Sequence, residues 1–270
     1  MKTLLAAGGA LALENPSANE VLRAFVTHAG GDEARVVIVA LASAEPQETS
    51  EAYTAVFQAL GVRHITTLSD LTERTQAPTI DLTPLQTATG IYLSGGNQLR
   101  FTTLVNDTAV AEALHAAYER GAVIFGSSAG TAVLSRLMLA YGESGHTPRQ
   151  GMAHFASGLG LLDGVIFDQH FSQRGRLGRL LTAVANNPQL LGVGIDENTA
   201  VFIQDTCATV LGQHGVTLID GQYGLSNAAD RDPSDLITLT GYRLHHLAAG
   251  ATFDLSTRTV CLSAERRAFA

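Results

Sequence analysis

The chain has 270 residues, of which 46% are hydrophobic and 16% are charged, and its formal net charge at pH 7 is −8. This length fits one large α/β domain, and this composition excludes a disordered chain. The acidic balance argues against a nucleic acid or an anionic membrane as partner, because both are bound through clusters of Lys and Arg. We therefore expect a compact, soluble protein with a single domain over residues 1–270.

The cysteine content and the first residues of the chain indicate the cellular compartment of the protein. Cys207 and Cys261 are too few and too far apart for a disulfide scaffold, which favours the reducing cytoplasm. The start, MKTLLAAGGALAL, has some features of a secretory signal, but Gly8 and Gly9 interrupt its apolar run. A first core strand that ends in a Gly-Gly turn is the preferred interpretation. No run reaches the roughly 18 to 20 apolar residues that a membrane-spanning helix needs.

Apolar runs alternate with helical patterns through the first two thirds of the chain. TLLAAG precedes a helical pattern at 19–28, RVVIVAL precedes one at 48–60, and GIYLSGG precedes helical sequence up to Gly121. Apolar strands that are each followed by a helix predict a mostly parallel sheet covered on both faces. Ligands bind beyond the carboxyl ends of such strands, so Gly95 and Gly126 are both expected at that edge.

The remaining third of the chain no longer shows regular alternation of apolar strands and helices. A helix with one buried face is predicted at 175–186, where Leu177, Leu180, Leu181 and Val184 have helical spacing. Residues 140–153 are expected to form a polar loop that could cover a site. Short strand patterns beyond Gly192 predict antiparallel strands added to the sheet.

Residues 123–132, VIFGSSAGTA, end a buried strand at Ser128 between Gly126 and Gly130. One interpretation is a nucleophile elbow, in which a strained turn exposes the serine and a helix follows, here TAVLSRLML. The other interpretation is an ordinary tight connection. The five-residue pattern alone is weakly specific.

A nucleophilic serine needs a base within hydrogen-bond reach and a group that orients the base. His170 is the candidate base, because it ends the apolar run of DGVIFDQHF. The other eight histidines lack an acidic companion at a suggestive position, and an isolated histidine is usually a packed side chain. Glu197 ends another apolar run and is the candidate acid. The order Ser, His, Glu differs from the Ser, acid, His order of the α/β-hydrolases.

These residues resemble the cyanophycinase and peptidase E group of serine exopeptidases. The resemblance runs over most of the chain, and its most specific part is DQHFSQRGRLGR at 168–179, which is typical of cyanophycinases. It implies a fold like that of class I glutamine amidotransferases and flavodoxins. It also implies Ser128 as nucleophile, His170 as base, Glu197 as acid, and an oxyanion hole made by the Gly96 and Ala129 amides. A phosphate cradle at Gly95-Gly96 is the rival interpretation, but the full phosphate-binding motifs are missing.

Three arginines fall within six positions beside the proposed base in an otherwise acidic chain. A solvated helix face is the usual explanation of such a cluster, but guanidinium groups also bind carboxylates. The resemblance implies a pocket for cyanophycin, a polyaspartate with arginine on each β-carboxyl, with Asp168 on the arginine side of the substrate. The pocket residues that it implies are Gln98, Asp168, Gln169, Arg174, Arg176 and Arg179.

Two stretches depart from the cyanophycinase pattern. GGALALENPSANE lacks the usual charged segment after the first Gly-Gly, and Asn97 replaces an aspartate. Three functions therefore remain open: a cyanophycinase-like exopeptidase, an Asp-X dipeptidase or carboxypeptidase with the same machinery, and a catalytically silent binding protein. Neither a metal nor an organic cofactor is expected, and the resemblance suggests a homodimer.

Overall fold

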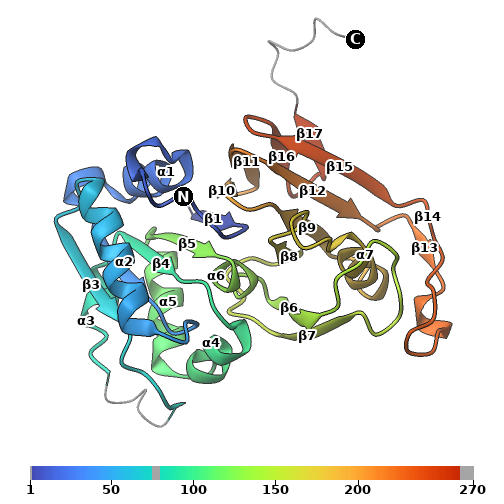
Figure 1. Cartoon of the computed structure of the whole chain (residues 1–270), viewed down its shortest axis with the longest axis horizontal. Coiled ribbons are helices and arrows are strands. Elements are labelled where there is room, and N and C mark those ends of the chain that lie inside the picture. Colours follow the sequence, from blue (N-terminus) through green and yellow to red (C-terminus); the bar gives the residue numbers. More distant parts are fainter. Residues whose placement is uncertain (1, 75–79, 262–270) are drawn as a thin grey trace, which may run out of the picture.

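The computed structural model describes residues 2–74 and 80–261, which form two main β-sheets with helices around them (Figure 1). The large sheet has nine strands, in the order β17-β16-β11-β10-β1-β5-β4-β2-β3. Its parallel part consists of β1 (Thr3–Ala7), β2 (Arg35–Val39), β3 (His64–Leu68), β4 (Gly90–Leu93) and β5 (Val123–Ser127). Its antiparallel part consists of β10 (Thr199–Gln204), β11 (Cys207–Gly212), β16 (Thr252–Asp254) and β17 (Thr259–Cys261). The predicted α/β architecture with added antiparallel strands is confirmed.

Helices cover both faces of the parallel strands. Apolar side chains of α1 (Glu20–Ala29) and α2 (Pro46–Ala59) share one buried cluster with β1, β2, β4 and β5. On the other face, α3 (Thr83–Thr87), α4 (Gln98–Val105) and α5 (Ala109–Glu119) share a second cluster. Because β1, β2, β4 and β5 are buried on both faces, their sequences are almost continuously apolar, and that made them predictable, whereas the edge strand β3 is largely exposed and polar.

The small sheet has the order β15-β12-β9-β8 and was not expected as a separate unit. It contains β8 (Val165–Gln169), β9 (Leu191–Ile195), β12 (Gly215–Asp220) and β15 (Arg243–Ala248). The antiparallel pairing predicted beyond Gly192 holds for β9 with β12, but β9 also pairs parallel with β8, which was not predicted. The predicted helix between them, α7 (Leu177–Asn186), is the reason, since a helical crossover returns the chain in the same direction.

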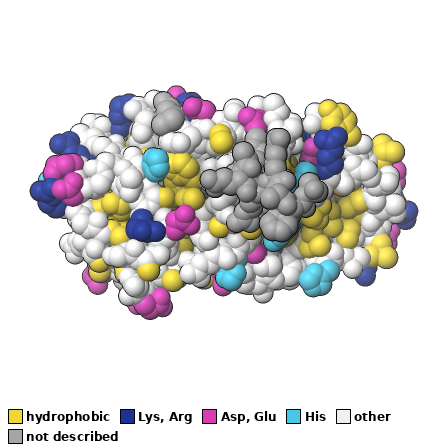
Figure 2. All heavy atoms as spheres, turned by 90° about the horizontal axis from the view of Figure 1, so that it is seen from above, with side chains coloured by type: hydrophobic (Ala, Val, Ile, Leu, Met, Phe, Trp, Pro, Cys, Tyr) yellow, Lys and Arg dark blue, Asp and Glu magenta, His cyan; other side chains and the backbone are white. Residues whose placement is uncertain are grey.

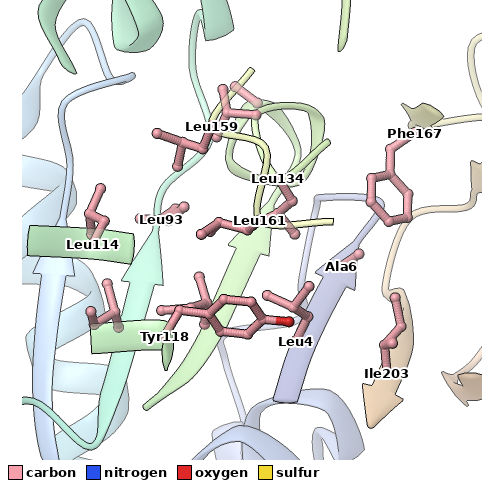
Figure 3. Close-up of a cluster of buried hydrophobic side chains, with 14 of the residues drawn as sticks. Leu4, Ala6, Leu93, Leu114, Tyr118, Leu134, Leu159, Leu161, Phe167 and Ile203 are labelled. Carbon is pink, nitrogen blue, oxygen red and sulfur yellow. The ribbon is translucent and has the colours of Figure 1, made fainter. Parts of the chain in front are cut away.

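The two sheets share one apolar core. Val193, Val216 and Leu218 of the small sheet belong to the same cluster as Val201 and Ile203 of the large sheet. Figure 3 shows this continuity, with Phe167 of β8 at the same core as Leu4 and Ala6 of β1 and Ile203 of β10. This packing fixes the position of the small sheet relative to the parallel strands.

Two predictions about the middle of the chain need correction. The helix after Ser128 is only α6 (Ala129–Ala132), and Leu137 already begins β6 (Leu137–Gly142), which pairs with β7 (Ala153–Ser157). Residues 140–142 and 153 therefore belong to a hairpin, and only 143–152 form the loop. The Gly145 amide donates to the Gly175 carbonyl and the Gly178 amide donates to the Gly145 carbonyl, both at 2.8 Å. The loop is thus tied to the turn that precedes α7.

The other elements are short. They are the two-stranded pair β13 (Leu225–Ser226) and β14 (Leu239–Thr240) and the 3-10 turns Pro16–Ala18, Gly31–Glu33 and Ala228–Asp230. None of the helices in the described ranges combines the length and hydropathy needed to cross a bilayer. Lys and Arg on the face shown in Figure 2 occur in small groups beside Asp and Glu.

Candidate active site

Ser128 stands between β5 and α6 in a strained backbone conformation, with φ 54° and ψ −111°. Its two flanking glycines are sterically required. A Cβ on Gly126 would overlap the Gly130 carbonyl, and a Cβ on Gly130 would overlap the Leu93 carbonyl. The strand can therefore turn sharply into the helix only without side chains at these positions. This is the geometry that a nucleophile elbow requires.

His170 directly follows β8 and faces Ser128. Its Nε2 lies 2.9 Å from the Ser128 Oγ, and the residue is 8% exposed. The His170 amide donates to the Gly8 carbonyl at 2.8 Å, and a Cβ on Gly9 would lie 2.5 Å from the His170 Cε1. The Gly-Gly turn after β1 therefore leaves the space that the imidazole fills.

Glu197 follows β9 and completes a hydrogen-bond chain. Its Oε1 lies 2.6 Å from the His170 Nδ1. Because a carboxylate only accepts, Nδ1 carries the proton and Nε2 is left free to accept from the serine. The Glu197 amide donates to the Gln173 Oε1 at 3.1 Å, and Asn198, with φ 48°, donates its amide to the Gly9 carbonyl at 2.9 Å.

The environment lowers the pKa of His170 below its usual value. Burial is the largest cause, and the positive charges of Arg174 and Arg176 act in the same direction. The hydrogen bond and the charge of Glu197 oppose them by stabilising the protonated ring. His170 is therefore neutral at pH 7, which is the state in which it can accept a proton.

The two proposed oxyanion residues lie in the segments next to Ser128. Ala129 is the first residue of α6, where an amide has no partner within the helix. Gly96 has φ 135°, and a Cβ there would overlap the Ala42 carbonyl. A Cβ on the neighbouring Gly95 would lie 3.9 Å from the Ser128 Oγ, so this turn packs against the serine.

Asp168 lies beneath the site with 1% exposure and is already paired with arginines. Arg179 donates to both of its carboxylate oxygens, with 2.9 Å between Nε and Oδ2, and Arg176 Nη1 lies 3.3 Å from Oδ1. The implied role of Asp168 as a contact for a substrate arginine is therefore not what this geometry provides. Asp168 instead holds two guanidinium groups in place.

Arg176 contributes a buried positive charge to this cluster. It donates to the carbonyl oxygen of Gln169 and, at 3.0 Å, to the Gln169 Oε1, while its own Nε is buried without a partner among the described residues. Burial lowers the pKa of Arg176 to about 10, so the group stays charged at neutral pH. Arg176 and Arg179 together with Asp168 carry a net charge of +1.

The other implied pocket residues differ in their surroundings. Gln169 lies beside the nucleophile, with 3.5 Å between its Oε1 and the Ser128 Oγ. Gln98 donates its amide to the Leu139 and Ala140 carbonyls at 3.1 and 2.6 Å, which ties α4 to β6. Arg174 is exposed in the turn that follows His170, and its amide donates to the His170 carbonyl.

Sequence reasoning missed Asp196, the neighbour of Glu197. Asp196 is 6% exposed and accepts from the Ser172 amide at 2.9 Å, the Ser172 hydroxyl at 2.6 Å and the Gly215 amide at 3.2 Å. The available signal was its position directly after the apolar run of β9, next to the candidate acid Glu197. That position alone does not tell which of the two neighbouring acids faces the histidine.

Within the described ranges, no group of three or more His, Cys, Asp and Glu side chains could hold a metal ion. The polar side chains of Ser128, His170 and Glu197 form hydrogen bonds with one another.

Comparisons with known proteins identify the family of this chain. The model of peptidase family S51 matches residues 4–211. A cyanophycinase of Trichormus variabilis is 38% identical over 251 residues, which cover 92% of this chain and 84% of that protein. A cyanophycinase of Geminocystis herdmanii is 37% identical over 242 residues, covering 88% and 89% of the two chains.

The fold also matches a solved structure, that of a peptidase from an acI-B1 actinobacterium. The TM-score is 0.66 at 20% identity, with 94% of this chain and 97% of that chain covered. The family match and the two relatives together cover both the Ser128 elbow and the segments of His170 and Glu197. The chain therefore belongs to peptidase family S51 and is a hydrolase of the peptidase class.

Proposed function

We propose that this protein is a serine exopeptidase that acts through Ser128, His170 and Glu197. The observation that carries the proposal is the continuous hydrogen-bond chain, with 2.9 Å between the Ser128 Oγ and the His170 Nε2 and 2.6 Å between the His170 Nδ1 and the Glu197 Oε1. A strained serine, a neutral imidazole and an orienting carboxylate are the parts that acyl transfer requires.

The reaction follows from these positions. His170 takes the Ser128 proton as Oγ attacks the carbonyl carbon of the scissile amide, and the Gly96 and Ala129 amides donate to the developing oxyanion. The protonated His170 then gives its proton to the leaving amine, which leaves an acyl-serine. Water attacks this ester and passes a proton to His170, and that proton returns to Ser128 when the acid product departs. Glu197 stays ionised throughout and holds the Nδ1 proton.

The charges around the site support a substrate with carboxylates. Two arginines share the single carboxylate of Asp168, and the exposed Arg174 adds a further positive charge near His170. Anionic groups of a substrate would balance this excess. A catalytically silent binding protein is disfavoured, because binding alone does not require a neutral histidine between a strained serine and a carboxylate.

We infer that the substrate is cyanophycin or a related aspartate- and arginine-containing peptide, with release of β-aspartyl-arginine. Support comes from the 37–38% identity with cyanophycinases and from the DQHFSQRGRLGR stretch at 168–179. In this proposal Gln98, Gln169, Arg174, Arg176 and Arg179 line the pocket.

An Asp-X dipeptidase or carboxypeptidase with the same machinery is the second candidate. Two observations favour it: Ala10, exposed at φ 45° directly after Gly9, brings no charge to this edge, and the Asn97 side chain is used to cap α4. Ala10 follows Gly9 and Asn97 lies two residues after Gly95, and a Cβ on either glycine would lie 3.1 or 3.4 Å from the Ser128 Cβ, so both positions can affect the choice of substrate.

Product analysis separates these candidates. Wild type and Ser128→Ala are incubated with purified cyanophycin and with α-linked peptides that carry acidic or basic termini, and products are identified by mass spectrometry. Release of β-aspartyl-arginine by the wild type alone supports the cyanophycinase proposal. Trimming of α-linked peptides with cyanophycin untouched supports the second candidate, and equal turnover by Ser128→Ala rejects the mechanism.

We also propose a cytoplasmic homodimer with one domain per chain. The low cysteine content and the family resemblance support this proposal. Light scattering on a sizing column tests the dimer, and a single cooperative unfolding transition is expected for one domain.

A further inference from the structure

The base and the acid of the proposed site both lie in turns that contain a residue with left-handed backbone conformation. His170 has φ 48°, and Glu197 precedes Asn198, which also has φ 48°. This conformation costs a residue other than glycine about 1 to 2 kcal/mol, although asparagine adopts it readily, so the backbone at His170 depends on the contacts around it. Backbone bonds to Gly8 and Gly9 fix one side of each turn.

Asp196 fixes the other side. Its Oδ1 accepts from both the amide and the hydroxyl of Ser172, two residues after His170, and its Oδ2 accepts from the Gly215 amide at the start of β12. A carboxylate with 6% exposure is costly unless such bonds compensate for lost hydration. One buried side chain thus joins the turn of the base, the end of β9 and β12.

A second contact runs in the opposite direction. The Gln173 side chain, from the turn of the base, accepts from the Glu197 amide at 3.1 Å. Two side-chain links therefore join the turn of His170 to the turn of Glu197. One is the pair of bonds from Ser172 to Asp196, and the other is the bond from the Glu197 amide to Gln173. Neither link includes a hydrogen bond to the Ser128 Oγ.

We propose that Asp196 is a positioning residue for the reaction, which through Ser172 holds the His170 imidazole between Glu197 and Ser128. This inference rests on the proposed catalytic role of these three residues. A shift of about 1 Å at reacting groups can cost on the order of 100-fold in rate, so a small loosening of the turn would be visible in kcat.

The test uses two variants. Asp196→Asn keeps the shape and can still accept from Ser172, but its amide nitrogen then faces the Gly215 amide, which is a second donor. Ser172→Ala removes only the 2.6 Å hydroxyl bond and leaves the carboxylate in place. We expect kcat to fall about 10- to 100-fold in the first variant and about 3- to 10-fold in the second, with KM changed less than about 2-fold in both.

Asp220→Asn is the matched control. Asp220 is also a buried carboxylate on β12, 3% exposed, but it lies at the other end of that strand and pairs with Arg258. Its substitution is expected to lower the melting temperature by a similar amount, since it too disturbs a buried carboxylate, and to leave kcat within about 2-fold. Equal kcat in Asp196→Asn, Ser172→Ala and this control would overturn the inference.

The pH profile adds a readout that a purely structural role would not change. The charged groups that act on His170 are Glu197 from the β9–β10 turn and Arg174 and Arg176 from its own turn. Since the bond to Glu197 raises the pKa of His170, loosening it moves the acidic limb of kcat/KM to lower pH in Asp196→Asn. An unmoved limb together with wild-type kcat contradicts the positioning role.

The rate at which a fluorophosphonate labels Ser128 separates this inference from the proposed function. If the wild type is labelled and the variants react equally fast, only the positioning role fails. If the wild type is not labelled at Ser128, the proposed mechanism fails and the inference fails with it. If Asp196→Asn does not fold, Ser172→Ala alone decides.

Discussion

Ser128 extends from β5 of the large sheet, whereas His170 and Glu197 follow β8 and β9 of the small sheet. The serine is placed by backbone geometry, since Gly126 and Gly130 leave no room for side chains. The turns of the base and the acid are held by backbone bonds to Gly8 and Gly9 and by hydrogen bonds that the Asp196 and Gln173 side chains accept. The shared core holds the two sheets together and so brings Ser128 close to His170. The proposed reaction therefore depends on the packing between the sheets.

The largest effect is expected at the nucleophile. Ser128→Ala removes one oxygen and should lower kcat on the order of a million-fold, because the acyl-serine can no longer form. The free energy of unfolding should change by less than about 0.5 kcal/mol, since the backbone is unaltered. Steady-state kinetics and chemical denaturation measure the two quantities, and a large loss of stability would mean that the serine is chiefly structural.

The acid partner should have the next largest effect. Glu197→Gln keeps the shape but can donate to the His170 Nδ1, which favours the tautomer with the proton on Nε2. That tautomer cannot accept from Ser128, so kcat is expected to fall about 10³- to 10⁴-fold, as for the corresponding change in other serine hydrolases. Retention of more than a tenth of wild-type kcat would show that Glu197 does not orient the base.

Gly9→Ala probes the contact between the turn after β1 of the large sheet and His170, which follows β8 of the small sheet. The new Cβ would lie 2.5 Å from the His170 Cε1 and 3.1 Å from the Ser128 Cβ, so the imidazole must move and kcat should fall about 100-fold. Gly61→Ala is the matched control, because Gly61 also has positive φ, 90°, but no atom lies within 4 Å of its Cβ position. Both variants lose about 1 to 2 kcal/mol to the left-handed backbone, whereas only the first should lose activity. Similar kcat values for the two would contradict the close fit at Gly9.

The smallest effect is expected in the pH profile. Burial and the charges of Arg174 and Arg176 hold the pKa of His170 below 6.5, so the acidic limb of kcat/KM for the wild type should lie below pH 6.5. Arg174→Gln removes one of these charges, which raises the pKa of His170 and moves the limb to higher pH. Unchanged limbs in the two proteins would show that Arg174 does not act on the base.

Sequence reasoning succeeded where structure is local. The parallel strands β1, β2, β4 and β5 could be predicted because each is a continuous apolar run, and the Ser128 elbow because its glycines are spaced around the turn. Ser128, His170 and Glu197 were singled out as residues that end such strands. In the structure these three residues form one hydrogen-bond chain, and their catalytic role stays a prediction.

It failed where the outcome depends on partners far apart in the sequence. An apolar run does not reveal which sheet it joins, so the small sheet and the parallel pairing of β9 were missed. A cluster that contains Asp168 and three arginines does not reveal which charges neutralise one another. Asp196 was overlooked for the same reason, since its partners Ser172 and Gly215 come from two other segments.

The most direct test of the proposed mechanism is to map the residue that a fluorophosphonate probe modifies, by peptide mass spectrometry of the wild type and of His170→Ala. We expect one adduct on Ser128 in the wild type and a labelling rate at least 100-fold lower without the base. No adduct on Ser128, or equal labelling of Ser128 in both proteins, would contradict the hydrogen-bond chain as the catalytic device.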